Sequence, residues 1–245
     1  EPLGAYYGSD FIRCGRGLTF AGVDLDNTAG ECLGAEPGAL YVAADGSPQL
    51  DNAGTYVVGN PQPDWTGSLR TSFRVSKFSI GGLLDIRNGG DAHTGTKGAL
   101  HHFGTSKESQ VNRDGGNFVF GESYFGHETV AGPGAGMAVP LGEAWYTNNG
   151  GTFNGPTSQF VEDGGFVKLR EISVGYTFDQ PWVSRLLGFS SMEVRVAGRN
   201  LHTWTKYTGV DPETSLLGSA SPLRGIDYFN NPQNRSYVFS LTLNR

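Results

Sequence analysis

The sequence has no long apolar run and no run of basic residues. No stretch approaches the roughly 18 consecutive apolar residues that a membrane-spanning helix requires. The formal net charge is −6, and an acidic chain without a basic patch gives no reason to expect a nucleic-acid partner. No signal peptide opens the sequence, as expected of a mature or truncated product.

Signatures of catalysis are also missing. The sequence has no GxSxG, HExxH or P-loop motif, and its carboxylates are scattered rather than paired for acid–base chemistry. We therefore expect no enzyme activity, no catalytic residue and no cofactor.

Metal-binding patterns are weak. Four histidines, at positions 93, 101, 102 and 127, lie in one long segment, where solvated loop histidines are more common than metal ligands. Asp24, Asp26 and Asp51 resemble part of a calcium loop, but the position that requires glycine is Ala29. We expect no metal site.

Cysteine is scarce, with Cys14 and Cys32 the only two. Neither a CxxC motif nor a nearby histidine accompanies them, which argues against a metal site. In an extracytoplasmic protein such a pair predicts a disulfide, with two free thiols as the alternative.

What the sequence does contain is strict alternation of apolar and polar residues. It recurs in five segments, 65–75, 78–87, 166–178, 191–201 and 235–244, and glycine, at 38 of 245 residues, is about twice as frequent as usual. Period-two alternation predicts strands with one apolar and one wet face. We place Phe73, Ile80, Leu84, Val174, Val194 and Leu241 on the apolar face, and Arg70, Arg74, Asp85, Glu193 and Arg195 on the other.

The strand lengths and the connections between them favour a transmembrane β-barrel. Strands of about 9–11 residues cross a bilayer at a tilt. About two residues join the first two strands and residues 179–190 join the next two, whereas residues 88–165 and 202–234 are long. Short turns on one side and long loops on the other are typical of outer-membrane barrels with a polar lumen. The predicted fold is all-β, an antiparallel meander within such a barrel. A soluble β-sandwich also alternates, but its strands are usually shorter.

Two features refine this picture. Alternation places Lys168 and Arg170 on the same face as Ile172, which predicts that this face leaves the lipid near Arg170. Residues 182–188 predict a short helical turn, with Pro181 just before it or at its first position.

The chain divides, on this interpretation, into two regions. Residues 1–64 form an extracellular loop region with short strands, and residues 65–245 form the C-terminal barrel segment. Ligand chemistry belongs in the long loops, where Trp145 and Tyr146 are candidates for stacking on a sugar ring; packing of loop against loop is the alternative.

Several motifs resemble the C-terminal part of the SusC/RagA-type TonB-dependent receptors. The most specific span residues 163–176 (DGGFVKLREISVGY) and 198–213 (GRNLHTWTKYTGVDPE). Others are residues 1–8 (EPLGAYYG), 45–48 (DGSP) leading to 59–66 (GNPQPDWT), 85–91 (DIRNGGD) and 232–239 (PQNRSYVF). They occur in the family's order along nearly the whole chain.

The resemblance implies uptake of glycans or peptides across the outer membrane. Members of the family are large barrels with an N-terminal plug, a SusD-like lipoprotein lid and an energy supply from the TonB complex, which acts on the plug. This sequence departs from the pattern: it has no plug, about five membrane-length strands, and a terminus, Leu241 to Arg245, without the aromatic residue common in such barrels.

Five strands are too few to enclose a lumen, since about eight are the minimum. Their two open edges must pair with another polypeptide in lipid. That partner is either the rest of the receptor barrel and plug or further copies of this chain, the latter giving a self-assembling extracellular filament or ring. A soluble carbohydrate-binding sandwich is the third alternative.

Overall fold

The computed structural model describes residues 5–15, 30–51, 55–113, 117–121, 129–216, 218 and 224–245. The chain forms two compact units, each built from separate stretches of sequence. The first comprises residues 1–62, 91–162 and 215–230, and the second residues 63–90, 163–214 and 231–245. The division at residue 64 that the sequence suggests stays a prediction.

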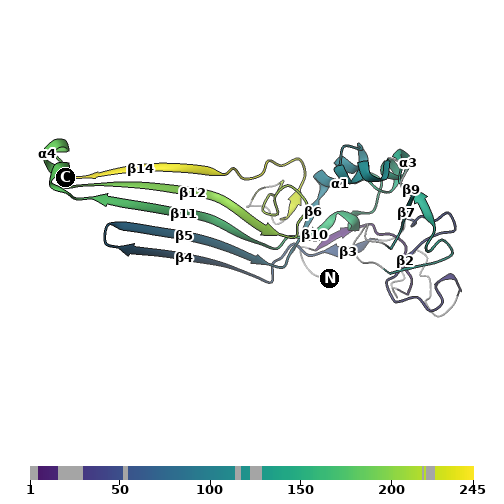
Figure 1. Cartoon of the computed structure of the whole chain (residues 1–245). Coiled ribbons are helices and arrows are strands. Elements are labelled where there is room, and N and C mark those ends of the chain that lie inside the picture. The colour runs from purple at the N-terminus through teal and green to yellow at the C-terminus, as the bar shows by residue number, and fades with distance from the viewer. Residues whose placement is uncertain are drawn as a thin grey trace. The chain divides into compact units, whose positions relative to one another are not determined.

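The second unit is built on a five-stranded antiparallel sheet (Figure 1). Its strands are β4 (Trp65–Val75), β5 (Phe78–Asn88), β11 (Phe166–Phe178), β12 (Ser191–Thr205) and β14 (Ser236–Asn244), in the order β14-β12-β11-β5-β4. These are the five strands that alternation predicts; β12 continues four residues beyond its predicted end at 201. Ser76, with φ 54°, makes the tight turn between β4 and β5.

The register of the sheet separates apolar from polar side chains. One transverse row consists of Phe73, Ile80, Val174, Val196 and Phe239. All five are between 39% and 78% exposed, so this face is not covered within the described chain. The adjacent row is Arg74, Ser79, Gly175, Arg195 and Ser240. The predicted assignment of the two faces is confirmed.

A β-bulge corrects the prediction for Lys168 and Arg170. Leu169 pairs with Leu84, and Ile172 pairs with Gly82, two residues away on β5, so Leu169 and Ile172 share the apolar face although they are three residues apart. The register shifts between Leu169 and Glu171, where Arg170 is the extra residue. Lys168 pairs with Asp85 on the polar face. The prediction that Lys168 shares the face of Ile172 is therefore wrong, and the apolar face continues past Arg170.

Helix α4 (Pro181–Leu187) connects β11 to β12, as predicted from residues 182–188. Pro181 lies in its first turn, where a missing N–H costs nothing. Gly188 ends the helix in the left-handed conformation, with φ 71°.

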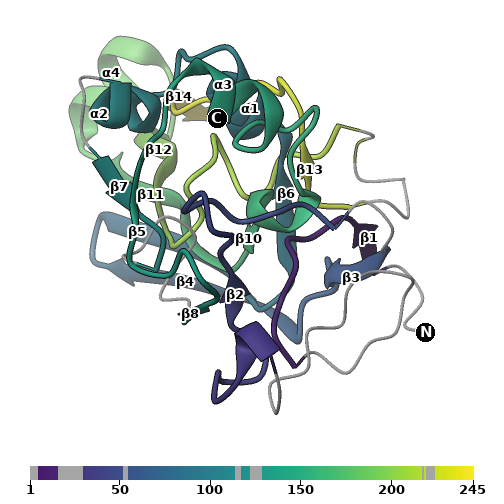
Figure 2. The same ribbon diagram turned by 90° about the vertical axis from the view of Figure 1, so that its right-hand side faces the viewer.

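The first unit contains short elements (Figure 2). Its small sheets pair β1 (Tyr6–Gly8) with β3 (Tyr56–Gly59), β2 (Leu40–Tyr41) with β8 (Val130–Ala131), and β7 (Asn117–Val119) with β9 (Ala138–Pro140). A three-stranded sheet has the order β10-β6-β13, from Val161–Asp163, Asp91–Thr94 and Ile226–Asp227. The helices are η1 (Gly30–Cys32), α1 (Gly95–His102), α2 (Lys107–Arg113), α3 (Glu143–Asn148) and η2 (Thr157–Phe160).

Two clusters of buried residues stabilise this unit. The larger contains Phe11, Leu40, Val42, Phe120, Leu141, Trp145 and Tyr146. The smaller cluster consists of Cys14, Cys32 and Ala39. The two cysteines form a disulfide, which confirms that prediction. None of the described helices has the length and apolarity to cross a membrane.

Candidate functional site

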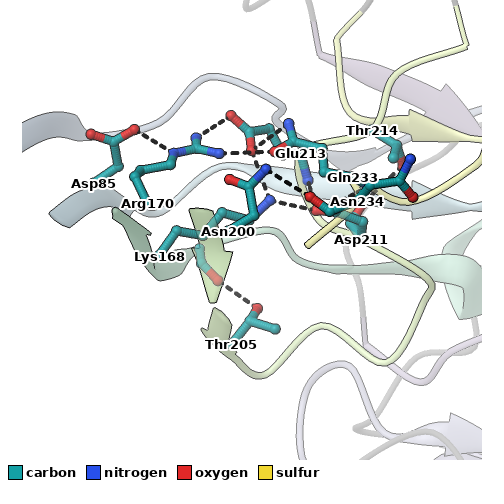
Figure 3. Close-up of polar contacts among 11 residues, drawn as sticks. Asp85, Lys168, Arg170, Asn200, Thr205, Asp211, Glu213, Thr214, Gln233 and Asn234 are labelled. Atoms are coloured by element: carbon teal, nitrogen blue, oxygen red, sulfur yellow. Dashed lines mark hydrogen bonds and ion pairs between the residues drawn. The ribbon is translucent and has the colours of Figure 1, made fainter. Parts of the chain in front are cut away.

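A cluster of charged side chains lies at one end of the five-stranded sheet (Figure 3). Lys168 and Arg170 come from the start of β11, and Asp85 from the end of β5. Asp211 and Glu213 come from the chain that follows β12, and Gln233 from the chain that precedes β14. We call these six residues the rim cluster. It joins parts of the sequence up to 148 positions apart, which is the separation of Asp85 and Gln233.

Lys168 is the buried centre of the rim cluster. Its Nζ lies 2.8 Å from Asp211 Oδ1 and 2.7 Å from Glu213 Oε2, and its side chain is only 4% exposed. A buried ammonium is costly unless it is paired and hydrogen-bonded. Here two carboxylates surround it, and the neighbouring Phe166 ring lies 5.2 Å from Nζ.

Arg170, at the bulge in β11, joins the sheet to the loop that carries Asp211 and Glu213. Its Nε donates to Asp85 Oδ2 at 2.6 Å, its Nη1 to Gln233 Oε1 at 3.0 Å, and its Nη2 to Glu213. Gln233 in turn donates through Nε2 to Glu213 Oε2 at 2.9 Å and through its backbone N–H to Asp211 Oδ2 at 3.2 Å. The bulge therefore places a second cation, the Arg170 guanidinium, beside Lys168 on the polar face.

The loop is shaped locally by the sequence Asp211-Pro212-Glu213. The Glu213 backbone N–H donates to Asp211 Oδ1 at 3.0 Å, and Thr214 Oγ1 donates to the Asp211 carbonyl at 2.8 Å. These bonds are typical of an Asx turn, which fixes the two carboxylates on one side of the loop.

The ionisation of Glu213 reflects both burial and pairing. Burial by itself raises the pKa of this carboxyl, but hydrogen bonds from Arg170 and Lys168 outweigh it, and the pKa is lowered from its usual value. Glu213 is therefore charged at neutral pH and holds the two cations together.

A pocket of about 410 Å³ adjoins the rim cluster. Asp85, Arg170 and Glu213 line it together with Ser68, whose hydroxyl donates to Asp85 Oδ1 at 2.7 Å. Along the same polar face, Arg199 Nε pairs with Glu171 Oε2 at 3.1 Å, and Arg195 Nη2 donates to Ser173 Oγ at 2.7 Å. The polar face is thus lined by side chains that hydrogen-bond to one another.

The rim cluster was not predicted as a site. Four of its residues, Lys168, Arg170, Asp211 and Glu213, belong to the two most specific motifs of the sequence, and Asp85 and Gln233 belong to two of the others. The sequence did contain one signal: alternation placed Lys168 and Arg170 on a strand face that is otherwise apolar. Such a placement requires either a bulge that turns the cations away or carboxylates that pair with them. Sequence alone does not show which distant carboxylates supply that partner.

Trp145 and Tyr146, the predicted ligand residues, lie in the larger buried cluster of the first unit. They are 8% and 4% exposed, and the Trp145 ring lies 5.1 Å from that of Phe120. Because its faces are covered, the Trp145 indole has little surface left for a ligand, whereas Tyr146 reaches the wall of a second pocket. Ligand stacking by either residue stays a prediction.

Only some of the candidate metal residues lie in the part of the chain that the structure describes. His127, Asp24 and Asp26 lie outside the described residues, and Asp51 accepts a hydrogen bond from Tyr56. His101 Nε2 pairs with Glu108 Oε2 at 2.9 Å. Within the described ranges, no group of three or more His, Cys, Asp or Glu side chains is arranged to hold a metal ion.

The sequence is similar to curated TonB-dependent receptors. It is 23% identical to TonB-dependent receptor P3 of Formosa agariphila over 99% of the chain, and 22% identical to TonB-dependent receptor P39 of the same organism over 76%. The chain spans about a fifth of the length of these relatives, 22% and 17% respectively. No family model matches the sequence.

Solved structures share the fold. The RagAB peptide importer in its closed-closed state matches 98% of this chain with a TM-score of 0.52 and 14% identity, and the chain covers 23% of that protein. A further structure of the RagAB peptide transporter gives a TM-score of 0.51 at 15% identity, with 98% and 22% covered. The chain is therefore similar over nearly its whole length to a segment of a curated TonB-dependent receptor, and it shares the fold of part of the RagAB importer.

Proposed function

We propose that this chain forms part of the barrel wall of an importer that carries glycans, peptides or similar nutrients across the outer membrane. The observation that carries the proposal is the five-stranded sheet, in which one exposed apolar face opposes one charged face. Lipid would solvate the first face and a hydrated lumen the second. The uncovered apolar face also argues against a soluble sandwich, in which a second sheet would bury it.

The partners of the proposed importer follow from the open edges of the sheet. Within the described chain, β4 and β14 each pair on one side only. Unpaired backbone groups cost several kcal/mol each in lipid, so both edges would pair with the rest of a receptor barrel that also holds a plug. A TonB complex acting on the plug and a SusD-like lipoprotein over the extracellular mouth complete the proposal.

The rim cluster has a role in this importer. Lys168 and Arg170 fix the loop of Asp211 and Glu213 over the polar face, and the adjoining pocket presents Ser68 and Asp85. Ion pairs with buried side chains would hold the loop of Asp211 and Glu213 in one conformation while solutes pass. The loop would then be a fixed part of the barrel wall rather than a moving gate.

Uptake in cells tests the proposal. Fluorescent oligosaccharides and oligopeptides are offered to cells that carry the receptor containing this chain and to cells that lack it, with and without a protonophore. We expect at least one solute to enter only with the receptor and only in energised cells. If no solute in either class depends on the receptor, or if its entry is insensitive to the protonophore, the proposal fails.

A further inference from the structure

A second pocket lies in the first compact unit, whereas the residues of the rim cluster belong to the second unit. It measures about 550 Å³. It opens between the end of α1 and the start of α3, two helices that contact each other. The lining residues used below are His102, Phe103, Leu141, Glu143, Tyr146 and Thr147.

One wall of the pocket is aromatic and exposed. Phe103 is 66% exposed, an unusual position for a phenyl ring. Its centroid lies 5.3 Å from that of His102 and 5.9 Å from that of Phe153, which is 49% exposed. These edge-on contacts hold the rings in place, so the Phe103 ring is positioned and still accessible.

The opposite wall belongs to the folded core. Leu141 and Tyr146 are 1% and 4% exposed and are members of the larger buried cluster. The pocket is thus anchored to the best-packed part of the unit. A ligand there would meet a preformed surface, which reduces the ordering cost of binding.

Glu143 and Thr147 present hydrogen-bond acceptors to the pocket, and His102 adds an imidazole whose Nδ1 is buried without a hydrogen-bond partner among the described residues. The Glu143 carboxylate is exposed and forms no ion pair within the described part of the chain. The Thr147 hydroxyl donates to the Glu143 backbone carbonyl at 2.9 Å, which leaves its oxygen lone pairs free to accept. None of the lining residues is Lys or Arg. This chemistry disfavours an anionic ligand and suits a donor that carries positive charge.

We propose that this pocket binds a ligand through an ammonium group, which pairs with Glu143 and lies against the Phe103 ring. A carboxylate supplies charge-assisted hydrogen bonds, and an aromatic face attracts a cation within about 6 Å of its centroid. The inference deepens the proposed function and rests on it, because the pocket would be a substrate subsite of the importer. The ammonium group could belong to a basic peptide or to an amino sugar.

Binding to the detergent-solubilised receptor that contains this chain tests the subsite. Ligand-observed NMR titrations compare N-acetyl-lysine amide with its neutral isostere N-acetyl-norleucine amide, and glucosamine with N-acetylglucosamine. We expect saturable binding of one or both ammonium compounds, at least about tenfold tighter than that of the neutral partner. The tighter of the two identifies the source. Equal affinity of charged and neutral partners, or no saturation by either ammonium compound, overturns the proposal.

Variants localise the binding to this pocket. Glu143→Gln should weaken ammonium binding about tenfold and Phe103→Leu several-fold, whereas Phe103→Tyr, which keeps the ring, should bind like the wild type. Glu36→Gln changes an exposed carboxylate elsewhere in the same unit and should have no effect. Wild-type affinity in Glu143→Gln overturns the assignment. Loss of binding in Glu143→Gln with uptake intact counts against the subsite alone, whereas ammonium binding by a wild-type receptor that imports neither class of solute counts against the proposed function alone.

Discussion

Lys168 and Asp211, 43 residues apart in sequence, form an ion pair of 2.8 Å between side chains that are only 4% and 9% exposed. The pair joins β11 to the loop after β12. Breaking one partner of such a pair leaves a buried charge unmet, which makes it far more consequential than a surface pair.

Replacing Lys168 with methionine should release the loop of Asp211 and Glu213. We expect a loss of about 3–5 kcal/mol in the local stability of that loop, because Asp211 would keep its charge without its cation. Hydrogen exchange of the backbone amides over residues 206–216 measures it. Lys77→Met is the matched control, since the Lys77–Asp179 pair is 35% and 51% exposed and should contribute little. Equal protection in the two variants would show that the rim cluster does not hold the loop.

Acid should loosen the same loop. The pKa of Glu213 is lowered in the folded chain, so the unfolded chain binds the proton more readily. The stabilisation by Glu213 is complete above the ordinary glutamate pKa of about 4.3 and declines as the pH falls below that value. Hydrogen exchange of the loop between pH 6 and pH 3 follows the change. Glu213→Gln should lose most of this dependence, and an unchanged pH profile in that variant would assign it to other groups.

An arginine on the apolar face should destabilise the inserted barrel. Leu241→Arg places a charge in lipid at a cost of about 2–4 kcal/mol near the bilayer midplane. Thr242→Arg, one position along the same strand and paired with Glu193, faces the polar side and should be tolerated. Urea unfolding in lipid vesicles compares the two; similar losses in both would contradict the assignment of the faces.

The disulfide should account for the stability of the N-terminal loop. Cys14 and Cys32 are separated by 18 positions, and closing a loop of that size stabilises by about 3 kcal/mol. We expect no alkylation of the unreduced protein, two alkylated thiols after reduction, and a lower free energy of unfolding once the bridge is reduced. Alkylation of either cysteine without reductant would show that the bridge is not formed in cells.

Alternation was enough to predict the five long strands and their faces, because a pleated strand leaves no freedom in the direction of successive side chains. It failed at Lys168 because a single inserted residue, Arg170, reverses that direction. The rim cluster could not be predicted from the sequence for a different reason. Two of its carboxylates, those of Asp211 and Glu213, come from a loop whose position depends on the register of β11, β12 and β14 together. Trp145 and Tyr146 lie in a long segment without periodicity, and the sequence does not show that they pack against Phe11, Leu40 and Val42 from the N-terminal region.

The most direct test of a lipid-exposed barrel wall compares two neighbouring transverse rows of the sheet. The measured quantity is the accessibility of each row to oxygen and to a polar nickel complex. Spin labels replace Phe73, Ile80, Val174, Val196 and Phe239 in turn, and then Arg74, Ser79, Arg195 and Ser240, in the receptor inserted in outer-membrane vesicles. A lipid-facing first row predicts high collision rates with oxygen and low rates with a polar nickel complex, and the reverse for the second row. Equal accessibility of the two rows to the nickel complex would contradict a lipid-exposed barrel wall.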